Sequence, residues 1–305
     1  MSRYFVAGSS GFLGSLLTRG LGADAHNRTI GHRYDFKHIT QCFKAIQESG
    51  CRTIFNCAGR VGGIKFNRDN SAVASEDNIL IGMNLMWSFY HLRLDKFIQV
   101  GSVCSYPREC PLPTSESSFW NGRPEETNAA YGLAKRTLVE YGQALSAQHK
   151  VNIIHPILAN LYGPGDTFDG EDNHVIAAMI KRFVEAAESG TKVVTLWGSG
   201  DCSREFLYVG DAVDALIFLN AKYDEPGIIN VSSGQEIKIK HLAEKIAKLA
   251  GYSGDIRWDK SKPDGQPRRH FDTSKLEKLG WSADISFNDG LKMTISDYKK
   301  RRIKA

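Results

Sequence analysis

The sequence lacks several patterns that would place it in a specialised class of proteins. Its 305 residues contain no apolar run near the roughly 20 residues that a membrane-spanning helix needs. Its six cysteines show neither a C-x-x-C pair nor the Cys/His spacing of a zinc site. No internal repeat and no low-complexity segment occurs. We therefore expect a globular protein with reduced thiols, no metal and no membrane contact.

The net charge of the chain excludes few further classes of protein. The formal net charge is +5, and most of it comes from the segment Lys299–Lys304. A basic tail of this kind is usually solvated, so we expect no nucleic-acid partner. The chain enters a strand-like pattern at Tyr4 without the apolar segment of a secretion signal, so we expect a cytoplasmic protein.

A strand, a glycine turn and a helix follow one another near the N-terminus. The buried-looking strand Tyr4–Ala7 runs into a G-x-x-G-x-x-G pattern and then an apolar helix. Such a turn brings the backbone and the helix N-terminus close to a pyrophosphate. A glycine turn without a ligand remains the alternative. The residues expected to contact a dinucleotide here are Gly8, Ser10, Gly11, Phe12, Leu13 and Gly14.

The end of the next expected strand predicts which dinucleotide binds. An NAD site usually has a carboxylate at the end of this strand, for the ribose 2′-OH. Here the strand Arg28–Ile30 is followed by His32 and Arg33, which would instead pair with the 2′-phosphate of NADP. We predict NADP with Arg33 as its main contact, and Asp35 and Phe36 flanking the adenine. An exposed Arg33 without a ligand stays open.

Alternating strands and helices predict the fold. Helices are expected at 40–48 and 72–94, and strands at 53–56, 97–100 and 151–157. This order is typical of right-handed βαβ units around a parallel sheet. We predict an α/β protein with a Rossmann-type, doubly wound sheet over 1–165, completed by parts of 197–230. Residues 166–305 would form mainly a smaller α/β substrate domain. An apolar stripe on the helix at 72–94 suits either the core or a dimer face.

Tyr131 and Lys135 lie four residues apart on a predicted helix and so share one of its faces. A free phenol has a pKa of about 10, and an ammonium group one turn away would lower it towards neutrality. Chance also produces this spacing on amphipathic helices. However, Ser102 and Cys104 follow a strand, and ligands of parallel sheets bind at such strand ends. The two segments therefore predict one catalytic site.

Two later segments suit a substrate. Asp172 or Asn173 is expected to cap a helix, which would place His174 in its first turn. The loop 262–268 carries cations among prolines and glycine and suits an anionic group such as a diphosphate. Without further context, a surface histidine and an exposed loop are the alternatives.

Taken together, these motifs resemble the extended short-chain dehydrogenase/reductase family, in its branch of GDP-sugar epimerase/reductases. The shared motifs are Gly8-Ser-Ser-Gly-Phe-Leu-Gly14, Val61-Gly-Gly-Ile64, Gly101-Ser-Val-Cys-Ser-Tyr-Pro107, Tyr131 with Lys135, Asn160-Leu-Tyr-Gly-Pro164, Asn173-His-Val-Ile176, Trp197-Gly-Ser-Gly200, Arg204-Glu-Phe-Leu207 and Lys262-Pro-Asp-Gly265. They span nearly the whole chain.

The resemblance implies an NADPH-dependent enzyme that epimerises a GDP-4-keto-6-deoxy sugar at C3 and C5 and reduces C4, with GDP-L-fucose as the expected product. It implies a reductase trio of Ser102, Tyr131 and Lys135, with Cys104 and His174 as base and acid of the epimerisation. Tyr131 and Lys135 are also expected among the cofactor contacts. It also implies a homodimer. The implied substrate contacts are Asn160, His174, Lys181, Trp197, Arg204 and Arg268.

The chain departs from the family pattern at two places. Ser10 stands where a basic residue is common, and Val103 replaces a small polar residue between Ser102 and Cys104. Two alternatives therefore stay open. One is a sibling enzyme acting on another GDP-4-keto sugar, of the heptose or colitose type. The other is a non-catalytic NADP-binding regulator, which the Tyr131–Lys135 pair disfavours.

Overall fold

A six-stranded parallel sheet forms the centre of the protein. The computed structural model describes residues 3–22, 34–62, 64–169, 173–262 and 264–304. Four strands lie side by side in the order β1 (Tyr4–Ala7), β2 (Thr53–Asn56), β3 (Lys96–Gln99) and β5 (Ile153–Leu158). The short strand β4 (Gly101–Ser102) and the late strand β9 (Gly227–Val231) both pair with β5.

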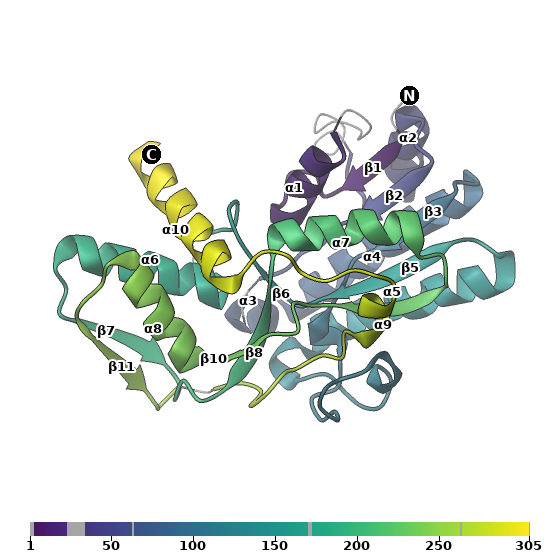
Figure 1. Cartoon of the computed structure of the whole chain (residues 1–305). Helices are drawn as coiled ribbons and strands as arrows, with labels where there is room; N and C mark the ends of the chain where they lie inside the picture. The colour runs from purple at the N-terminus through teal and green to yellow at the C-terminus, as the bar shows by residue number, and fades with distance from the viewer. Residues whose placement is uncertain (1–2, 23–33, 63, 170–172, 263, 305) are drawn as a thin grey trace.

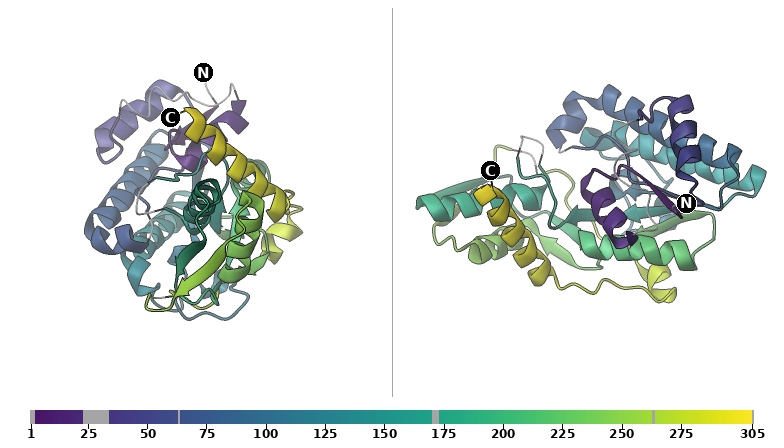
Figure 2. Two further views of the ribbon diagram at one scale, coloured as in Figure 1. Left: turned by 90° about the vertical axis from the view of Figure 1, so that its left-hand side faces the viewer. Right: turned by 90° about the horizontal axis from the view of Figure 1, so that it is seen from above.

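Helices cover both faces of this sheet, as Figures 1 and 2 show. One face carries α1 (Phe12–Gly20) and α7 (Val209–Lys222), which pack on each other. The other carries α2 (Ile39–Ser49), α4 (Ser71–His91) and α5 (Ala129–His149). Strands β2, β3 and β5 are buried along their whole length, because a parallel sheet covered on both faces offers no solvent side.

Short helices connect these elements. They are α3 (Ile64–Asp69), the 3-10 turns Val103–Ser105, Glu116–Ser118 and Glu126–Asn128, and α9 (Ser274–Lys278). The first 3-10 turn follows β4 directly and leads into the loop before α5. It therefore lies where the strands of the sheet end.

The remaining elements form a smaller layer with its own core, on the left of Figure 1. Strand β8 (Ser203–Tyr208) lies between β6 (Asn160–Tyr162), which is parallel to it, and the antiparallel β10 (Glu236–Lys238). Strands β7 (Val193–Trp197) and β11 (Asp255–Asp259) pair in parallel. Three helices pack here, namely α6 (Val175–Ser189), α8 (Ile239–Ala250) and α10 (Phe287–Lys304).

The predicted α/β fold with a Rossmann-type parallel sheet is confirmed. The strand expected at 28–30 lies outside the described residues. The sequence missed β6 and β10, each three residues long, because so short a strand leaves no periodic pattern. The basic tail belongs to α10, where Arg301 pairs with Asp297 and Arg302 pairs with Glu188, so it is not simply solvated.

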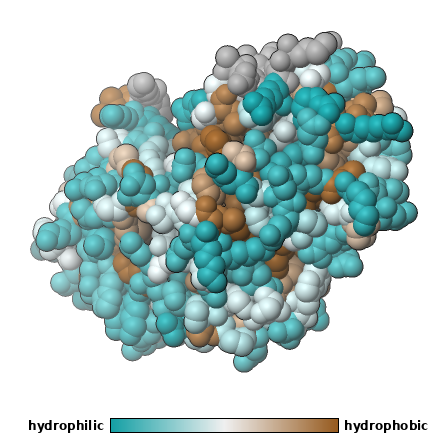
Figure 3. Space-filling model, turned by 45° about the vertical axis from the view of Figure 1, so that its right-hand side comes forward, coloured by the Kyte–Doolittle hydropathy of each residue, from teal (hydrophilic) through white to brown (hydrophobic). Residues whose placement is uncertain are grey.

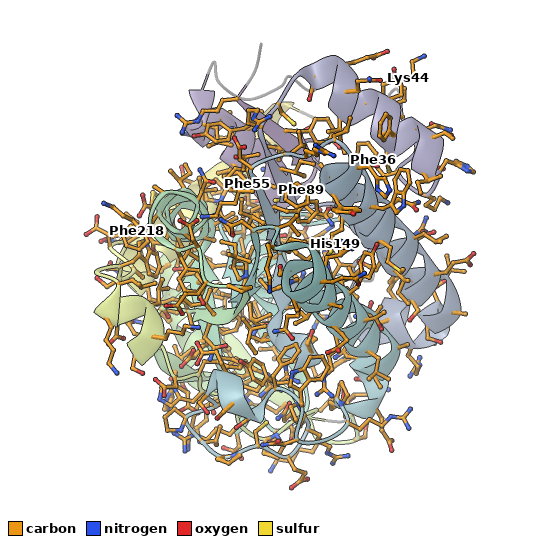
Figure 4. All side chains as sticks on the ribbon, turned by 90° about the vertical axis from the view of Figure 1, so that its right-hand side faces the viewer. Phe36, Lys44, Phe55, Phe89, His149 and Phe218 are labelled. Atoms are coloured by element: carbon orange, nitrogen blue, oxygen red, sulfur yellow. The ribbon has the colours of Figure 1, made fainter. Side chains whose placement is uncertain are left out.

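Interior and surface separate clearly. Phe55 and Phe89, which Figure 4 labels, have no exposed area and belong to the cores on either side of the sheet. The face in Figure 3 is mostly hydrophilic, with hydrophobic residues gathered in small patches. No helix among the described residues has the length and apolar character that crossing a membrane requires. All six cysteines are free thiols, as expected.

The buried side chain of His155 makes the stability of the fold depend on pH. His155 lies on β5 at the middle of the sheet with no exposed area. No described group hydrogen-bonds to either of its ring nitrogens. Burial lowers the pKa of His155 from 6.5 to about 3, so the ring is neutral in the folded protein. Unfolding exposes it to water, where it takes up a proton below pH 6.5.

We predict that His155→Leu stabilises the protein and weakens its sensitivity to acid. The wild type should lose stability as pH falls below 6.5, because the unfolded chain then binds the proton that the folded chain excludes. Between pH 7 and pH 5, the variant should escape about 2 kcal/mol of this loss. Urea unfolding at the two pH values measures it, with the exposed His241→Leu as control. Equal pH dependence of wild type and His155→Leu would contradict the prediction.

Candidate active site

The glycine turn after β1 forms a tight cradle in front of α1. Gly8 has φ +79°, a conformation that favours glycine, and its carbonyl oxygen accepts a hydrogen bond from the Gly11 amide at 2.9 Å. A Cβ atom added to Gly14 would overlap that same carbonyl. No side chain caps the start of α1, and its first turn contains no acidic residue that would repel an anion. This geometry suits a pyrophosphate, and the backbone at Phe12 and Leu13 forms the helix start.

The other predicted cofactor contacts have mixed outcomes. Ser10 and Asp35 are exposed, whereas Arg33 lies outside the described residues. Phe36, labelled in Figure 4, is only 7% exposed, and its ring meets Phe5 edge-on at 5.9 Å. Phe36 thus belongs mainly to the core, and its contact with adenine stays a prediction. An aromatic residue next to the sheet gains more by burial in the core than by exposure beside a ligand.

Ser102 and Cys104 lie together at the carboxyl end of β4. Ser102 caps the 3-10 turn Val103–Ser105, and its hydroxyl accepts a hydrogen bond from the Cys104 amide at 3.2 Å. Both side chains are partly exposed, whereas Val103 between them is buried. The turn thus directs a hydroxyl and a thiol to the same side of the sheet edge.

Tyr131 lies next to this pair, on the first turn of α5. Burial raises the pKa of its phenol well above the ordinary value, the nearby Cys104 raises it further, and the Ser102 hydroxyl lowers it. The Lys135 ammonium lies 5.8 Å from the centre of the phenol ring and donates to the Val100 carbonyl at 3.3 Å. The predicted site of Ser102, Cys104, Tyr131 and Lys135 is thus assembled in one place.

The structure does not show the predicted net lowering of the Tyr131 pKa, because burial has the larger effect and raises it. The sequence predicted that the ammonium would lower the pKa of the phenol. Both side chains are 7% exposed, and removal of water disfavours the charged form of each. Burial accordingly lowers the pKa of Lys135 to about 8 and leaves Tyr131 protonated at neutral pH. A protonated phenol is the form that donates a proton.

Three residues that the sequence did not reveal hold the Cys104 turn. A Cβ atom on Gly132 would overlap the Cys104 carbonyl oxygen, so glycine lets α5 approach the turn closely. The buried Arg136 donates from Nε to the Ser105 carbonyl at 2.5 Å. From the far end of the chain, the buried Arg269 donates to the Val103 carbonyl at 2.9 Å. Guanidinium groups therefore fix the backbone on both sides of Cys104.

His174 occupies a different position from the one expected. It is the capping residue before α6, one place earlier than the predicted first turn. Its Nδ1 lies 3.3 Å from Oδ1 of Asp166, which is 2% exposed. Among the described residues, the imidazole hydrogen-bonds to this carboxylate alone. The sequence placed Asp166 only in a proline–glycine loop, where no local pattern points to a partner eight residues later.

The remaining expected substrate contacts differ in availability. Trp197 is 64% exposed, and the Lys262 ammonium lies 5.7 Å above its ring. Asn160 donates to the Glu205 carbonyl at 3.1 Å and so joins β6 to β8. Lys181 pairs with Asp169 at 2.7 Å. These contacts occupy the Asn160 amide and the Lys181 ammonium, whereas the indole face stays open.

The cation predicted at position 268 is neutralised by a neighbour. Arg268 binds Glu236 through Nε and a terminal nitrogen at 2.7 Å each. Arg204 and Arg269 instead lie close enough to each other to interact electrostatically, and Arg204 interacts likewise with Cys104. Burial lowers the pKa of the Arg204 guanidinium. Two partly or fully buried cations beside the thiol form a strong anion site. No cluster of metal-binding side chains occurs among the described residues.

Comparisons with known proteins agree with this geometry. The model of the NAD dependent epimerase/dehydratase family matches residues 4–232. GDP-L-fucose synthase 1 of Arabidopsis thaliana is 36% identical over 303 residues, 98% of this chain and 94% of that relative. GDP-L-colitose synthase of Yersinia pseudotuberculosis is 36% identical over 262 residues, 85% and 83% of the two chains. The solved GDP-mannoheptose C4 reductase from Campylobacter jejuni, with NADP bound, has a TM-score of 0.88 at 25% identity and covers 98% of both chains.

We predict that Gly14→Ala weakens NADPH binding more than tenfold, because the added methyl group must push the turn out of its cradle shape. Fluorescence titration with NADPH measures the affinity. Ser15→Ala on the same helix is the control, since its hydroxyl bonds only to the Phe12 carbonyl. An unchanged affinity in Gly14→Ala would argue against this turn as the pyrophosphate site.

Proposed function

The chain belongs to the NAD dependent epimerase/dehydratase family, and on that basis we propose that it converts a GDP-4-keto-6-deoxy sugar with NADPH. The proposed reaction epimerises C3 and C5 and then reduces C4, with GDP-L-fucose as product. The GDP-L-fucose synthase of Arabidopsis supports this choice of substrate, because the similarity extends over nearly the full length of both chains.

One observation supports the double activity most strongly. The phenol of Tyr131 lies beside both Ser102 and Cys104, so a proton donor for reduction and a thiol base lie in one site. A reductase of this family needs only the Ser102–Tyr131–Lys135 trio. The additional thiol has a use if the same bound sugar also loses protons.

The epimerisation half follows from the chemistry of a 4-keto sugar. The ketone acidifies the protons at C3 and C5, and the Cys104 thiolate removes each of them. Such a base needs nearby positive charge, which Arg204 supplies. His174 donates its own proton to the opposite face, which inverts the configuration. Cys104 must then release the proton it took to solvent, and His174 must take one up, before the second inversion. The histidine must be protonated for this role.

The reduction half uses the other members of the site. NADPH, when bound along the Gly8–Gly14 turn, supplies the hydride for C4. Tyr131 donates a proton to the C4 oxygen, and the Ser102 hydroxyl holds the same oxygen. Lys135 lies one turn along α5, where its charge stabilises the phenolate left after transfer.

We assign the nucleotide half of the substrate to the smaller layer. The exposed Trp197 ring offers a stacking surface for guanine on the face opposite Lys262. Arg204 and Arg269 suit the diphosphate better than Arg268, since Glu236 already neutralises Arg268. Asn160, Lys181 and His174 remain proposed contacts. Residues 1–165 would then hold NADP, with Arg33 at its 2′-phosphate, and 166–305 mainly the substrate.

We further propose a cytoplasmic homodimer. Val73 and Leu80 on α4 and Leu133 on α5 are 47%, 37% and 40% exposed. The two helices pack along each other and share one outer surface. Exposed apolar side chains on neighbouring helices suit a second copy of the chain. The free thiols suit a reducing compartment.

A second candidate is a sibling activity on another GDP-4-keto sugar. The colitose synthase of Yersinia is as similar in identity as the Arabidopsis enzyme, although over a shorter length. The two candidates differ in the sugar ring rather than in the nucleotide or the cofactor. Incubation with GDP-4-keto-6-deoxymannose and NADPH, with product identification by NMR, tests the choice. Formation of GDP-L-fucose supports the first candidate, and turnover only with a 3-deoxy or heptose substrate supports the second.

We predict that Tyr131→Phe lowers substrate-dependent NADPH oxidation by roughly 10²–10⁴-fold, the usual contribution of a general acid. NADPH affinity should stay within about twofold, since the phenol is not part of the glycine turn. The loss of NADPH absorbance measures the oxidation rate, and fluorescence titration measures the NADPH affinity. The control is Tyr141→Phe, which removes a phenol oxygen ten residues further along α5. Full turnover in Tyr131→Phe would remove this residue from the reaction.

We predict that Cys104→Ser stops exchange of the C3 and C5 protons with solvent, because a serine hydroxyl is a far weaker base than a thiolate. The measurement is deuterium uptake from D₂O by the bound sugar, followed by NMR. Cys110→Ser, a thiol that donates to the Pro107 carbonyl, is the control and should exchange normally. Exchange at the wild-type rate in Cys104→Ser would exclude Cys104 as the base.

A further inference from the structure

The loop between β6 and α6 carries a buried carboxylate that contacts His174. Asp166 is 2% exposed, whereas the His174 side chain is 45% exposed. We propose that Asp166 is a positioning residue that orients the His174 imidazole and keeps it protonated for proton donation to the sugar. This inference rests on the proposed epimerisation, in which His174 is the acid.

The orientation of the His174 ring follows from which of its nitrogens hydrogen-bonds to Asp166. Nδ1 of His174 lies 3.3 Å from the Asp166 carboxylate, so Nδ1–H donates to it. Nε2 lies on the other side of the ring and stays available to the substrate. The contact thus fixes both the direction of the ring and the nitrogen that transfers the proton.

Protonation needs a nearby negative charge at this place. His174 precedes the first turn of α6, and the positive end of a helix dipole disfavours an imidazolium. The Asp166 carboxylate offsets that effect. Its hydrogen bond raises the pKa of His174 above the ordinary value, against the opposing effect of burial. An imidazole held in this way remains a proton donor nearer to neutral pH.

Helix α10 holds the loop that presents the carboxylate. The Gly165 amide donates to Asp297 at 3.0 Å, and Arg301 donates to the Asp166 backbone carbonyl at 3.0 Å. The Thr167 amide donates to the Asp166 carboxylate at 2.8 Å. Asp297 and Arg301 also pair with each other at 2.7 Å. The carboxylate is therefore fixed by backbone contacts that do not depend on the histidine.

Among the described residues, the charged groups of α6 and α10 that contact this loop are paired. From α6, Lys181 faces Asp169 of the same loop at 2.7 Å. From α10, the Arg301 and Asp297 charges compensate each other. Asp166 is the acidic group in direct contact with the imidazole. A change of charge at Asp166 should therefore act on His174 more than a change at its neighbours.

The first test measures the pKa of His174 by ¹H–¹⁵N NMR in the full-length protein, with His174→Gln to assign the signal. In the wild type, this pKa should exceed that of the exposed His241. In Asp166→Asn, which keeps the shape and the Thr167 contact but removes the charge, it should fall by about one unit. Asp95→Asn removes an equal charge at the exposed Arg52 pair and should leave it unchanged. A wild-type pKa no higher than that of His241, or no change in Asp166→Asn, would overturn the proposal.

The second test asks whether Asp166 acts through His174. The rate of deuterium exchange at C3 and C5 should fall as pH rises through the pKa of His174. Asp166→Asn should move this decline to lower pH by about one unit. In a His174→Gln background, the same substitution should cause no further loss, because its target is gone. An equal loss in both backgrounds would show a purely structural role and overturn the proposal.

A wrong proposal for Asp166 and a wrong epimerase assignment would give different results in these two tests. If the wild type exchanges no sugar protons, the epimerase assignment is wrong, while the NMR measurement still decides whether Asp166 holds His174 protonated. If Asp166→Asn unfolds, as circular dichroism would show, the comparison of His174 with His241 in the wild type decides the same question.

Discussion

The close packing of α5 against the Cys104 turn is the contact on which the proposed site depends. Gly132 allows it, because any side chain there would overlap the Cys104 carbonyl. The neighbours of that glycine on α5 then serve separate purposes. Tyr131 reaches Ser102 and Cys104, and Arg136 fixes the backbone of the turn from the other side. A helix held a few tenths of an ångström further away would separate the phenol from the groups it must work with.

Distant segments of the chain complete this arrangement. Arg269 comes from the loop before α9, yet it bonds to the Val103 carbonyl next to Cys104. The same loop packs against Arg204, whose terminal nitrogen would lie 3.5 Å from a Cβ atom on Gly265. The smaller layer and the central sheet therefore both contact the backbone of this turn.

The sequence predicted what depends on local patterns and missed what depends on long-range burial. The strands around the sheet, the glycine turn and the Tyr131–Lys135 pair follow from periodicity and spacing, and the structure contains them. Arg136, Arg269 and Asp166 could not be found in this way, because each is defined by a partner that only folding brings near. The burial of Phe36 was missed for the same reason, because its ring packs on Phe5, thirty-one residues earlier in the chain.

The pKa values of the two proposed acids in the site are raised by different means. Tyr131 keeps its proton because burial disfavours the phenolate, and a buried ammonium whose own pKa has fallen to about 8 does not reverse this. His174 is partly exposed, and the hydrogen bond to a buried carboxylate raises its pKa. Burial of Tyr131 and the carboxylate contact of His174 suit different steps of the proposed reaction. An imidazole that exchanges readily with solvent can serve two successive epimerisations, whereas a sequestered phenol is needed only once, when C4 is reduced. In the proposed reaction the sugar must be inverted first and reduced last, because the inversions need the ketone that reduction removes.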